Sequence, residues 1–430
     1  MPTPERLYYS DSFLRTFSGA VTDVREFTHS KSDTIWQVSL DHTVFYPTSG
    51  GQPFDTGTLR AISPSGAMRE IPVEQVEENE EGTVWHFVRE PLATGTRVEG
   101  QINWDRRFDH MQQHTGQHLL SAVFLRELQM PTVSFHLGES NSTIDIAGGL
   151  PAHTGLERVE RIANEIIFEN RPVTISYARR DEAEAMQAAG DLRKLPDRQG
   201  TIRLIEIANC DRNACGGTHV RSTGQIGVLL LRGVEKVSRG VRIEFVCGFR
   251  VVRAARADYS ILRKTTALLS TGATDLPETV GRLLTEAKTS EKERQKLREE
   301  VAEFQGAALA REVPIDNGLR LVVREWKDRD RDSVRLLASR TAAAAPGTAV
   351  IFCAKEGNTV RMFVARSSDL DFHCGQIVRE ALVQLGLRGG GSPDLAQREV
   401  PAELESTLLA SVTSAIRSAV ALSHRAGGNL

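Results

Sequence analysis

Residues 104–128 read WDRRFDHMQQHTGQHLLSAVFLREL, and this stretch decides how the chain on either side of it must fold. Its apolar side chains recur at steps of three and four residues, which predicts one long helix. Residues four apart lie on one face of a helix, so His114 and His118 can point at a single ion. His110 lies one turn earlier on the same face. Because a straight helix seldom gives one ion three ligands, we expect one of the three histidines to be only a neighbour of the ion.

A second pair of ligand-type residues follows about a hundred residues later, in Cys215-Gly-Gly-Thr-His219. The two glycines break any helix, so Cys215 and His219 must converge in a tight turn. Two ligands from a helix and two from a turn form a tetrahedral set of the kind that zinc binds. We predict one Zn²⁺ per chain, with these ligands: His114, His118, Cys215 and His219. Cys210 is a rival thiolate that we interpret as a small buried residue.

Residues 1–100 contain short runs of alternating polarity, such as residues 34–40, separated by Gly, Pro and Ser. This pattern predicts a β-barrel-like domain. Within it, the run Phe45 to Gly57 contains the glycine motif Gly50-Gly51-Gln52, where glycine permits close approach of a backbone or a ligand. Two interpretations stay open, a substrate-binding loop and a tight turn between strands.

The rest of the chain predicts three further parts. Residues 101–250 mix helices and strands in an α+β zinc domain around the metal ligands. Residues 251–313 predict a helical hairpin, and coiled-coil spacing at residues 297–308 makes it either a spacer or a dimer surface. Residues 314–430 alternate strands and helices, which is typical of a separate α/β domain. The predicted fold class is therefore α+β, with a barrel-like domain, a zinc domain, a hairpin linker and a C-terminal α/β domain.

Charge and composition narrow the class of protein. The 430 residues are 40% hydrophobic and 25% charged, which suits a globular chain with several cores. The formal net charge is -3, so contact with nucleic acid requires a local basic surface. Residues 232–264 supply one, with nine Lys or Arg, Arg242 among them, against three acids. This segment is either a phosphate-contacting surface or a charged surface that contacts nothing.

The expected location is the cytoplasm. Five scattered cysteines are too few for a disulfide framework and fit a reducing compartment. Residues 1–10 show no secretory signal, and no run approaches 18 uninterrupted apolar residues, so no membrane partner is expected.

Three motifs together resemble the signatures of a known family: His114-Thr-Gly-Gln-His118-Leu-Leu, Cys215-Gly-Gly-Thr-His219-Val and Ser49-Gly-Gly-Gln-Pro-Phe-Asp-Thr-Gly57. They are similar to motifs of the free-standing alanyl-tRNA editing proteins, the AlaX family, which are related to the editing domain of alanyl-tRNA synthetase. A fourth segment, residues 389–397, resembles the C-terminal domain of the same synthetase. It departs from that pattern after Gln397, where Arg-Glu-Val stands in place of further glycines.

The resemblance implies hydrolysis of the ester that links a wrong amino acid, serine or glycine, to tRNA(Ala), with zinc at the four predicted ligands. It also implies a C-terminal domain that grips the tRNA, and editing without synthesis, since no part resembles an adenylation domain. Catalytic roles are assigned to Thr115, Gln117 and Asp145, of which Gln117 and Asp145 would orient the metal ligands or a water. The expected substrate contacts are Gly50, Gly51, Gln52, Thr143, Thr218 and Arg242.

Several alternatives stay open at this point. Four protein ligands describe a closed structural zinc site, whereas catalysis needs an open position. Zinc can either lower the pKa of a bound water or bind the amino group and aim the ester at a separate water. The runner-up function is a tRNA-binding or regulatory protein with a structural zinc and no hydrolysis. A zinc peptidase is disfavoured because His-Thr-Gly-Gln-His lacks the glutamate of His-Glu-x-x-His enzymes. A homodimer through the hairpin or the C-terminal domain is a further expectation.

Overall fold

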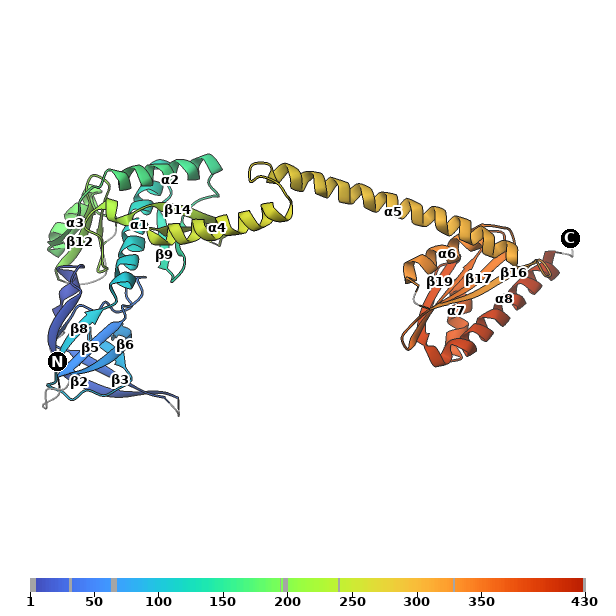
Figure 1. Cartoon of the computed structure of the whole chain (residues 1–430), viewed down its shortest axis with the longest axis horizontal. Helices are drawn as coiled ribbons and strands as arrows, with labels where there is room; N and C mark the ends of the chain where they lie inside the picture. Colours follow the sequence, from blue (N-terminus) through green and yellow to red (C-terminus); the bar gives the residue numbers. More distant parts are fainter. Residues whose placement is uncertain are drawn as a thin grey trace. The chain divides into compact units, whose positions relative to one another are not determined.

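The computed structural model of the chain describes residues 5–30, 33–62, 68–193, 195, 200–238, 240–327 and 329–427. The chain divides into two compact units, Met1–Thr265 and Thr266–Leu430 (Figure 1). Both units mix helices and strands, which confirms the predicted α+β class. The predicted domain boundaries after residues 100, 250 and 313 stay predictions.

The first unit begins with a closed six-stranded barrel in the order β2-β3-β7-β6-β5-β8, which confirms the predicted barrel. Its strands have these bounds: β2 Thr16–Ser30, β3 Asp33–Leu40, β5 Gly57–Ile62, β6 Met68–Glu78, β7 Val84–Val88 and β8 Arg97–Ile102. All their pairings are antiparallel, and closure leaves no free strand edge. Two short strands, β1 (Glu5–Arg6) and β4 (His42–Thr43), form a parallel pair, and the 3-10 turn η1 (Leu7–Tyr9) follows β1.

Beyond the barrel lie a four-stranded sheet in the order β14-β15-β10-β9 and a three-stranded sheet in the order β11-β12-β13, both antiparallel. The bounds are β9 Thr132–Leu137, β10 Ser142–Ile146, β11 Val173–Ala178, β12 Ile202–Ile207, β13 Asp211–Ala214, β14 Leu229–Val237 and β15 Gly240–Cys247. The helices of this part are α2 (His153–Phe168) and α3 (Arg180–Ala189), with a 3-10 turn η2 (Thr223–Ile226). The Asn164 side chain on α2 hydrogen-bonds both backbone groups of Leu229 and so covers the sheet edge at β14.

The central helix of the first unit is α1 (Trp104–Leu128), with the predicted bounds. It begins at Asn103, whose side-chain oxygen accepts from the backbone N–H of Arg106 at 3.2 Å, and it ends at Gln129 in a left-handed conformation. The second half of α1 packs apolar side chains against the four-stranded sheet and α2. The first half instead buries polar ones: Arg107, His110, Gln112, Gln113, His114, Thr115, Gln117 and His118. Because burying polar groups without partners is costly, the surrounding segments must supply those partners.

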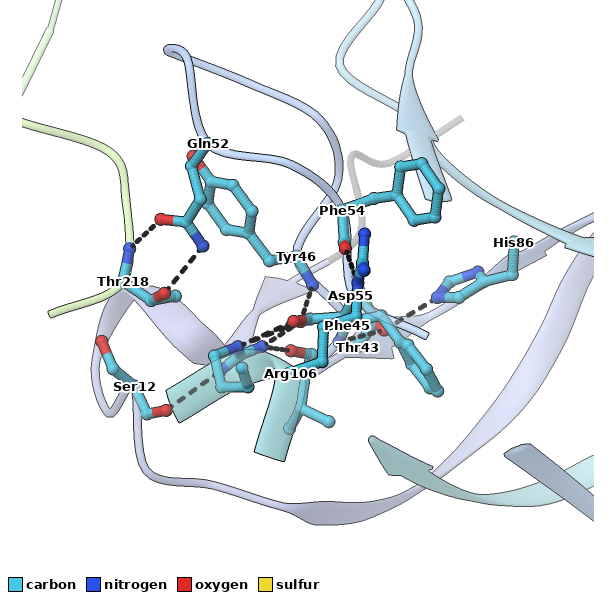
Figure 2. A network of polar contacts seen from close by, with 12 residues as sticks. Ser12, Thr43, Phe45, Tyr46, Gln52, Phe54, Asp55, His86, Arg106 and Thr218 are labelled. Atoms are coloured by element: carbon cyan, nitrogen blue, oxygen red, sulfur yellow. Dashed lines mark hydrogen bonds and ion pairs between the residues drawn. The ribbon is translucent and has the colours of Figure 1, made fainter. Parts of the chain in front are cut away.

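Arg107 has the most demanding side chain in that row, and it forms a fully buried ion pair with Asp55 of the glycine-rich segment. Its guanidinium also donates to the backbone carbonyls of Ser12 at 2.9 Å and Val44 at 2.5 Å. The Asp55 carboxylate in turn accepts from the backbone N–H of Tyr46 at 2.7 Å, and Figure 2 shows it at the centre of this network. The pair therefore joins α1 to three other segments of the unit.

Two helices occupy most of residues 249–312, namely α4 (Phe249–Leu268) and α5 (Leu276–Glu312). Pro277 lies in the first turn of α5, where its missing N–H has no helical partner to lose. The pairing of these helices into a hairpin stays a prediction.

The second unit contains a mixed four-stranded sheet in the order β16-β17-β18-β19, in which β16 and β17 are parallel. Its elements are β16 Arg320–Lys327, α6 Arg331–Ala343, β17 Thr348–Glu356, β18 Thr359–Arg366, α7 Cys374–Val383, β19 Leu395–Pro401, η3 Ala402–Leu404 and α8 Glu405–Gly427. Buried apolar clusters line both faces of this sheet. The strand β19 was not predicted from the sequence; it pairs Gln397 with Phe363 of β18.

One helical stretch among the described residues, Ala402–Ser423, is long and apolar enough to cross a membrane by length and composition alone. Its residues Leu408, Val412, Ile416 and Val420 are buried in the core of the second unit. Their four-residue spacing is that of an amphipathic helix packed on a core, which accounts for the apolar composition.

Removal of the Arg107 guanidinium tests the role of the buried pair. Arg107→Ala leaves Asp55 buried without its counter-charge, so we expect a loss of about 3–5 kcal/mol of stability in the first unit. Thermal denaturation measures this loss of stability as a fall in melting temperature of roughly 2–4 °C per kcal/mol. The matched control is Arg161→Ala, which removes an exposed ion pair to Glu165 in the same unit and should cost less than about 1 kcal/mol. Equal melting temperatures for the two variants would contradict the assignment.

His86 on β7 makes the barrel sensitive to acid. Its Nδ1–H donates to the Val38 carbonyl at 3.0 Å, its Nε2 accepts from the Thr43 hydroxyl at 2.9 Å, and burial lowers its pKa to about 4. The unfolded chain, with a histidine pKa of about 6.5, therefore binds more protons than the folded chain between pH 4 and 6.5. The contribution of His86 to the stability of the fold should be fully present above about pH 6.5, and it should fall by up to about 3 kcal/mol toward pH 4. Denaturant unfolding across this range should show a shallower slope for His86→Gln; an unchanged slope would refute the assignment.

Candidate metal centre and its surroundings

Four ligand-type side chains from α1 and from the turn after β13 meet at one point: His114, His118, Cys215 and His219. Each offers one ligand atom, and these atoms all lie within 4.8 Å of one another. The Cys215 Sγ lies 3.5 Å from His114 Nε2 and 3.3 Å from His219 Nε2. The group could hold a metal ion. His110, the remaining histidine of the α1 row, is not in the group, as expected for a neighbour.

The turn that carries Cys215 is held by backbone contacts. Arg203 on β12 donates from one guanidinium nitrogen to the carbonyls of Cys215 at 2.6 Å and Gly217 at 2.9 Å. The backbone N–H of Gly217 points at Cys215 Sγ at 3.3 Å. A Cβ atom at Gly217 would lie 2.1 Å from Cε1 of His114, so only glycine lets the turn approach the helix.

Gln52 of the glycine motif connects the two half-sites. Its Oε1 accepts from His114 Nδ1 at 2.9 Å and from the backbone N–H of Thr218 at 3.0 Å. Its Nε2 donates to the Thr218 hydroxyl at 2.8 Å, and Figure 2 shows the paired Gln52 and Thr218 side chains. Both residues were predicted as substrate contacts, but the structure places them, fully buried, against the ligands and each other.

Thr115 holds the second imidazole. Its hydroxyl lies 3.1 Å from His219 Nδ1 and accepts from the backbone N–H of Val220 at 3.2 Å. The backbone N–H of His219 also donates to the Ser12 hydroxyl at 3.3 Å. Thr115 was predicted to act on substrate or ligands, and its contacts are to a ligand.

Asp211, the first residue of β13, faces the third imidazole. One carboxylate oxygen lies 3.4 Å from His118 Nδ1, an ion-pair distance longer than a well-formed hydrogen bond. The same oxygen accepts from Arg193 at 2.8 Å and from the Asn213 amide. Asp211 keeps only 4% of its side chain exposed. All three imidazoles therefore turn Nδ1 toward an outer oxygen, which leaves Nε2 for the centre.

Protonation in the cluster follows from burial and proximity. Burial opposes the ionised thiol, but the adjacent His114 and His219 outweigh it and hold the pKa of Cys215 well below its usual value. Burial lowers the pKa of His219 to about 3. For His118 burial also lowers the pKa, yet Asp211 and Cys215 overcome it and raise the pKa to about 9. A metal ion would therefore bind Cys215 as a thiolate, and its binding would release a proton from His118.

The predicted glycines pack the motif against the sheet. Gly50 and Gly51 have positive φ values of 56° and 81°, and a Cβ at Gly51 would lie 2.6 Å from the Phe135 ring. The backbone N–H of Leu137 donates to the Gly51 carbonyl at 3.3 Å. The Phe135 ring lies 5.8 Å from the His114 ring, so the motif lies next to the ligand group.

Three other predicted residues are not brought to the ligands. Thr143 and Asp145 alternate along β10 with the buried Ile144, which packs in the core with α1, so they lie on the opposite face of the sheet. Asp145 accepts from the Arg242 guanidinium at 2.8 and 3.0 Å, and this contact lowers the pKa of its carboxyl. These residues therefore form a polar outer face of the sheet, and their predicted roles stay untested.

Gln117, between His114 and His118 in sequence, donates from Nε2 to the Ser121 hydroxyl at 2.9 Å. Its Oε1 is buried and has no partner among the described residues. Its predicted role in orienting the ligands or a water stays untested, and its unpaired acceptor lies on the helix that carries His114 and His118.

The basic segment is partly neutralised within the fold, and Arg239 lies outside the described residues. Four of its arginines pair with aspartates: Arg232 with Asp258, Arg242 with Asp145, and both Arg250 and Arg253 with Asp109. A phosphate-contacting role for the remaining charges stays a prediction.

Sequence reasoning missed Asp211 and Arg203. Asp211 directly follows the rival cysteine and precedes Cys215 by four residues, a proximity that could have drawn attention to it. No periodic pattern marks Arg203, since its role depends on pairing between β12 and β13.

Family models match three parts of the chain. Residues 202–244 match the threonyl and alanyl tRNA synthetase second additional domain, residues 2–106 match the class II (A) tRNA synthetases, and residues 318–418 match the DHHA1 domain. These matches fall in both compact units.

Curated relatives match over most of the chain. The alanyl-tRNA editing protein AlaX-L of Pyrococcus horikoshii is 30% identical over 416 residues, covering 93% of this chain and 96% of the relative. The alanyl-tRNA editing protein Aarsd1 of Bos taurus is 34% identical, covering 66% of this chain and 63% of that protein. The alanine–tRNA ligase of Pyrococcus abyssi is 32% identical across 93% of this chain, which spans only 42% of the ligase. By its end-to-end match to AlaX-L, the chain belongs to the family of the alanyl-tRNA editing proteins.

Proposed function

We propose that this protein is a trans-editing hydrolase that removes serine or glycine from mischarged tRNA(Ala) by zinc-dependent ester hydrolysis. The observation that carries the proposal is the converged group of three histidines and one cysteine, in a chain that matches AlaX-L over 93% of its length. The relatives' names supply the substrate class, and the group supplies a means of hydrolysis.

The residues present fit zinc. Three imidazole nitrogens and one thiolate are ligands that Zn²⁺ prefers. Hydrogen bonds orient the His114 and His219 rings, and Asp211 faces His118 at ion-pair distance. When bound, the ion would supply a Lewis acid that polarises an ester carbonyl or lowers the pKa of a water. Cys215 is partly exposed and the three histidines are buried, so a bound ion would lie near the surface of the first unit.

Buried acceptors around α1 support a polar substrate. His110 Nδ1, Gln117 Oε1 and the Ser142 hydroxyl are buried and have no partner among the described residues. Native proteins pair such atoms with water or ligand. We assign to them the binding of the amino group or hydroxyl of a seryl ester, because the hydroxyls of Thr115 and Thr218 are already hydrogen-bonded. An alanyl ester would leave a hydroxyl-binding acceptor unpaired, which disfavours it.

Location and assembly follow from the proposed substrate. A tRNA substrate places the protein in the cytoplasm, and its five cysteines, all free, fit a reducing compartment. Gripping of the tRNA by the C-terminal domain, residues 314–430, and homodimerisation through the predicted hairpin or that domain stay predictions. The competing function is tRNA binding with a purely structural zinc, which four protein ligands also suit.

A deacylation assay separates the two functions. Zinc-loaded protein should release serine, glycine or both from mischarged tRNA(Ala), and seryl-tRNA(Ala) should be cleaved at least about 100-fold faster than alanyl-tRNA(Ala). Radiolabelled amino acid that stays acid-precipitable with its tRNA measures the remaining ester. Intact seryl- and glycyl-tRNA(Ala), with tRNA binding preserved, would favour the structural-zinc alternative.

Ligand variants test the metal assignment. His118→Ala should lose both stoichiometric zinc and deacylation, because three remaining ligands hold the ion less tightly. Elemental analysis of the purified protein reports the zinc content. Cys215→Ser and Cys210→Ser make a matched pair, since Cys210 is outside the ligand group; only the first should lose zinc. Retained zinc and unchanged activity in His118→Ala would show that the wrong histidine has been assigned.

A further inference from the structure

The outer partners of the three imidazoles differ in chemistry. His114 faces an amide oxygen of Gln52 and His219 faces the hydroxyl of Thr115, whereas His118 faces the carboxylate of Asp211. A neutral oxygen orients an imidazole by one hydrogen bond. A carboxylate adds a full negative charge, which makes the ring a stronger electron donor to a cation on its other nitrogen.

The Asp211 carboxylate has its own support, separate from the ligands. Arg193 donates to it at 2.8 Å and Asn213 donates to the same oxygen. Only 4% of the Asp211 side chain is exposed, and it lies in the wall of a cavity of about 670 Å³. A buried carboxylate persists only when such partners hold it, so its orientation toward His118 is a maintained feature of the fold.

The other two partners serve the fold as well as the centre. Gln52 makes two hydrogen bonds to Thr218, and Thr115 accepts from the backbone of Val220, so both connect segments whether or not an ion is bound. Asp211 contacts the ligand group at His118, and it also accepts from Arg193 and Asn213. It is the one charged partner of the three, so its replacement should change the charge next to the ion, which replacement of the other two would not do.

From this asymmetry we propose that Asp211 is the positioning residue of the metal centre, and that it sets the affinity for the ion through His118 with Arg193 as its anchor. The inference rests on the proposed metal centre. It concerns a residue outside the ligand group, so its effect is expected first in metal binding.

Zinc affinity, measured by competition with a chromogenic chelator, tests the proposal without any assay of activity. Asp211→Asn keeps the size and one acceptor oxygen but removes the charge, and it should weaken zinc binding by about 10- to 100-fold. Asp211→Ala should lose at least as much zinc affinity as Asp211→Asn, and Asp211→Glu should bind zinc more tightly than either of them. The absorption spectrum of the cobalt(II)-substituted protein should also shift in Asp211→Asn, because the His118 ring loses its orientation.

The matched control is Asp191→Asn, which removes a carboxylate from the wall of the same cavity and should stay within about twofold of the unmodified protein. Arg193→Gln leaves Asp211 in place and should weaken zinc binding less than Asp211→Asn; it decides the matter if the Asp211 variants fail to fold. Affinity within twofold for Asp211→Asn, or for Arg193→Gln in that event, would overturn the inference while the metal centre stands. Absence of zinc binding in the unmodified protein would overturn both.

Discussion

The buried ion pair between Arg107 and Asp55 is the contact on which the arrangement of the first unit depends. Neither side chain has any exposed surface, and the guanidinium also donates hydrogen bonds to the backbone carbonyls of Ser12 and Val44. Such a pair is stable only with every polar atom satisfied, so it tolerates little displacement of the four segments that meet there. Asp55 lies three residues from Gln52, and Arg107 lies two helical turns before His114. The ion pair thereby determines where the glycine motif meets the candidate ligand.

Polar contacts connect this part of the first unit to the candidate metal centre. The first half of α1 buries polar side chains that would be costly without partners, and segments far away in sequence provide them. Gln52 and Thr115 hydrogen-bond His114 and His219, and Asp211 faces His118 at ion-pair distance. A site whose ligands are oriented before an ion arrives loses less entropy on binding it.

Much of this organisation was predictable. The helix from Trp104 to Leu128 has the bounds that its three- and four-residue spacing indicates, and the barrel follows from alternating polarity in its strands. Each pair of ligand-type residues was predictable, since spacing on a helix and a glycine turn are local properties, and the two pairs do come together. The strand β19 was not predicted, because its glycine-rich approach indicates a loop and only pairing with β18 makes it extended. Thr143 and Asp145 were assigned to the site although the register of β10 turns them to its outer face.

By itself the sequence determined the type of ligands, their local spacing and the resemblance to the alanyl-tRNA editing proteins, because motif chemistry is carried by neighbouring residues. Only the tertiary structure decided what surrounds those ligands. Asp211 faces a histidine 93 positions earlier in the chain, and Gln52 binds a turn 166 positions later. Such contacts depend on how strands pair and where a buried ion pair locks a helix, and no local pattern of residue types encodes them.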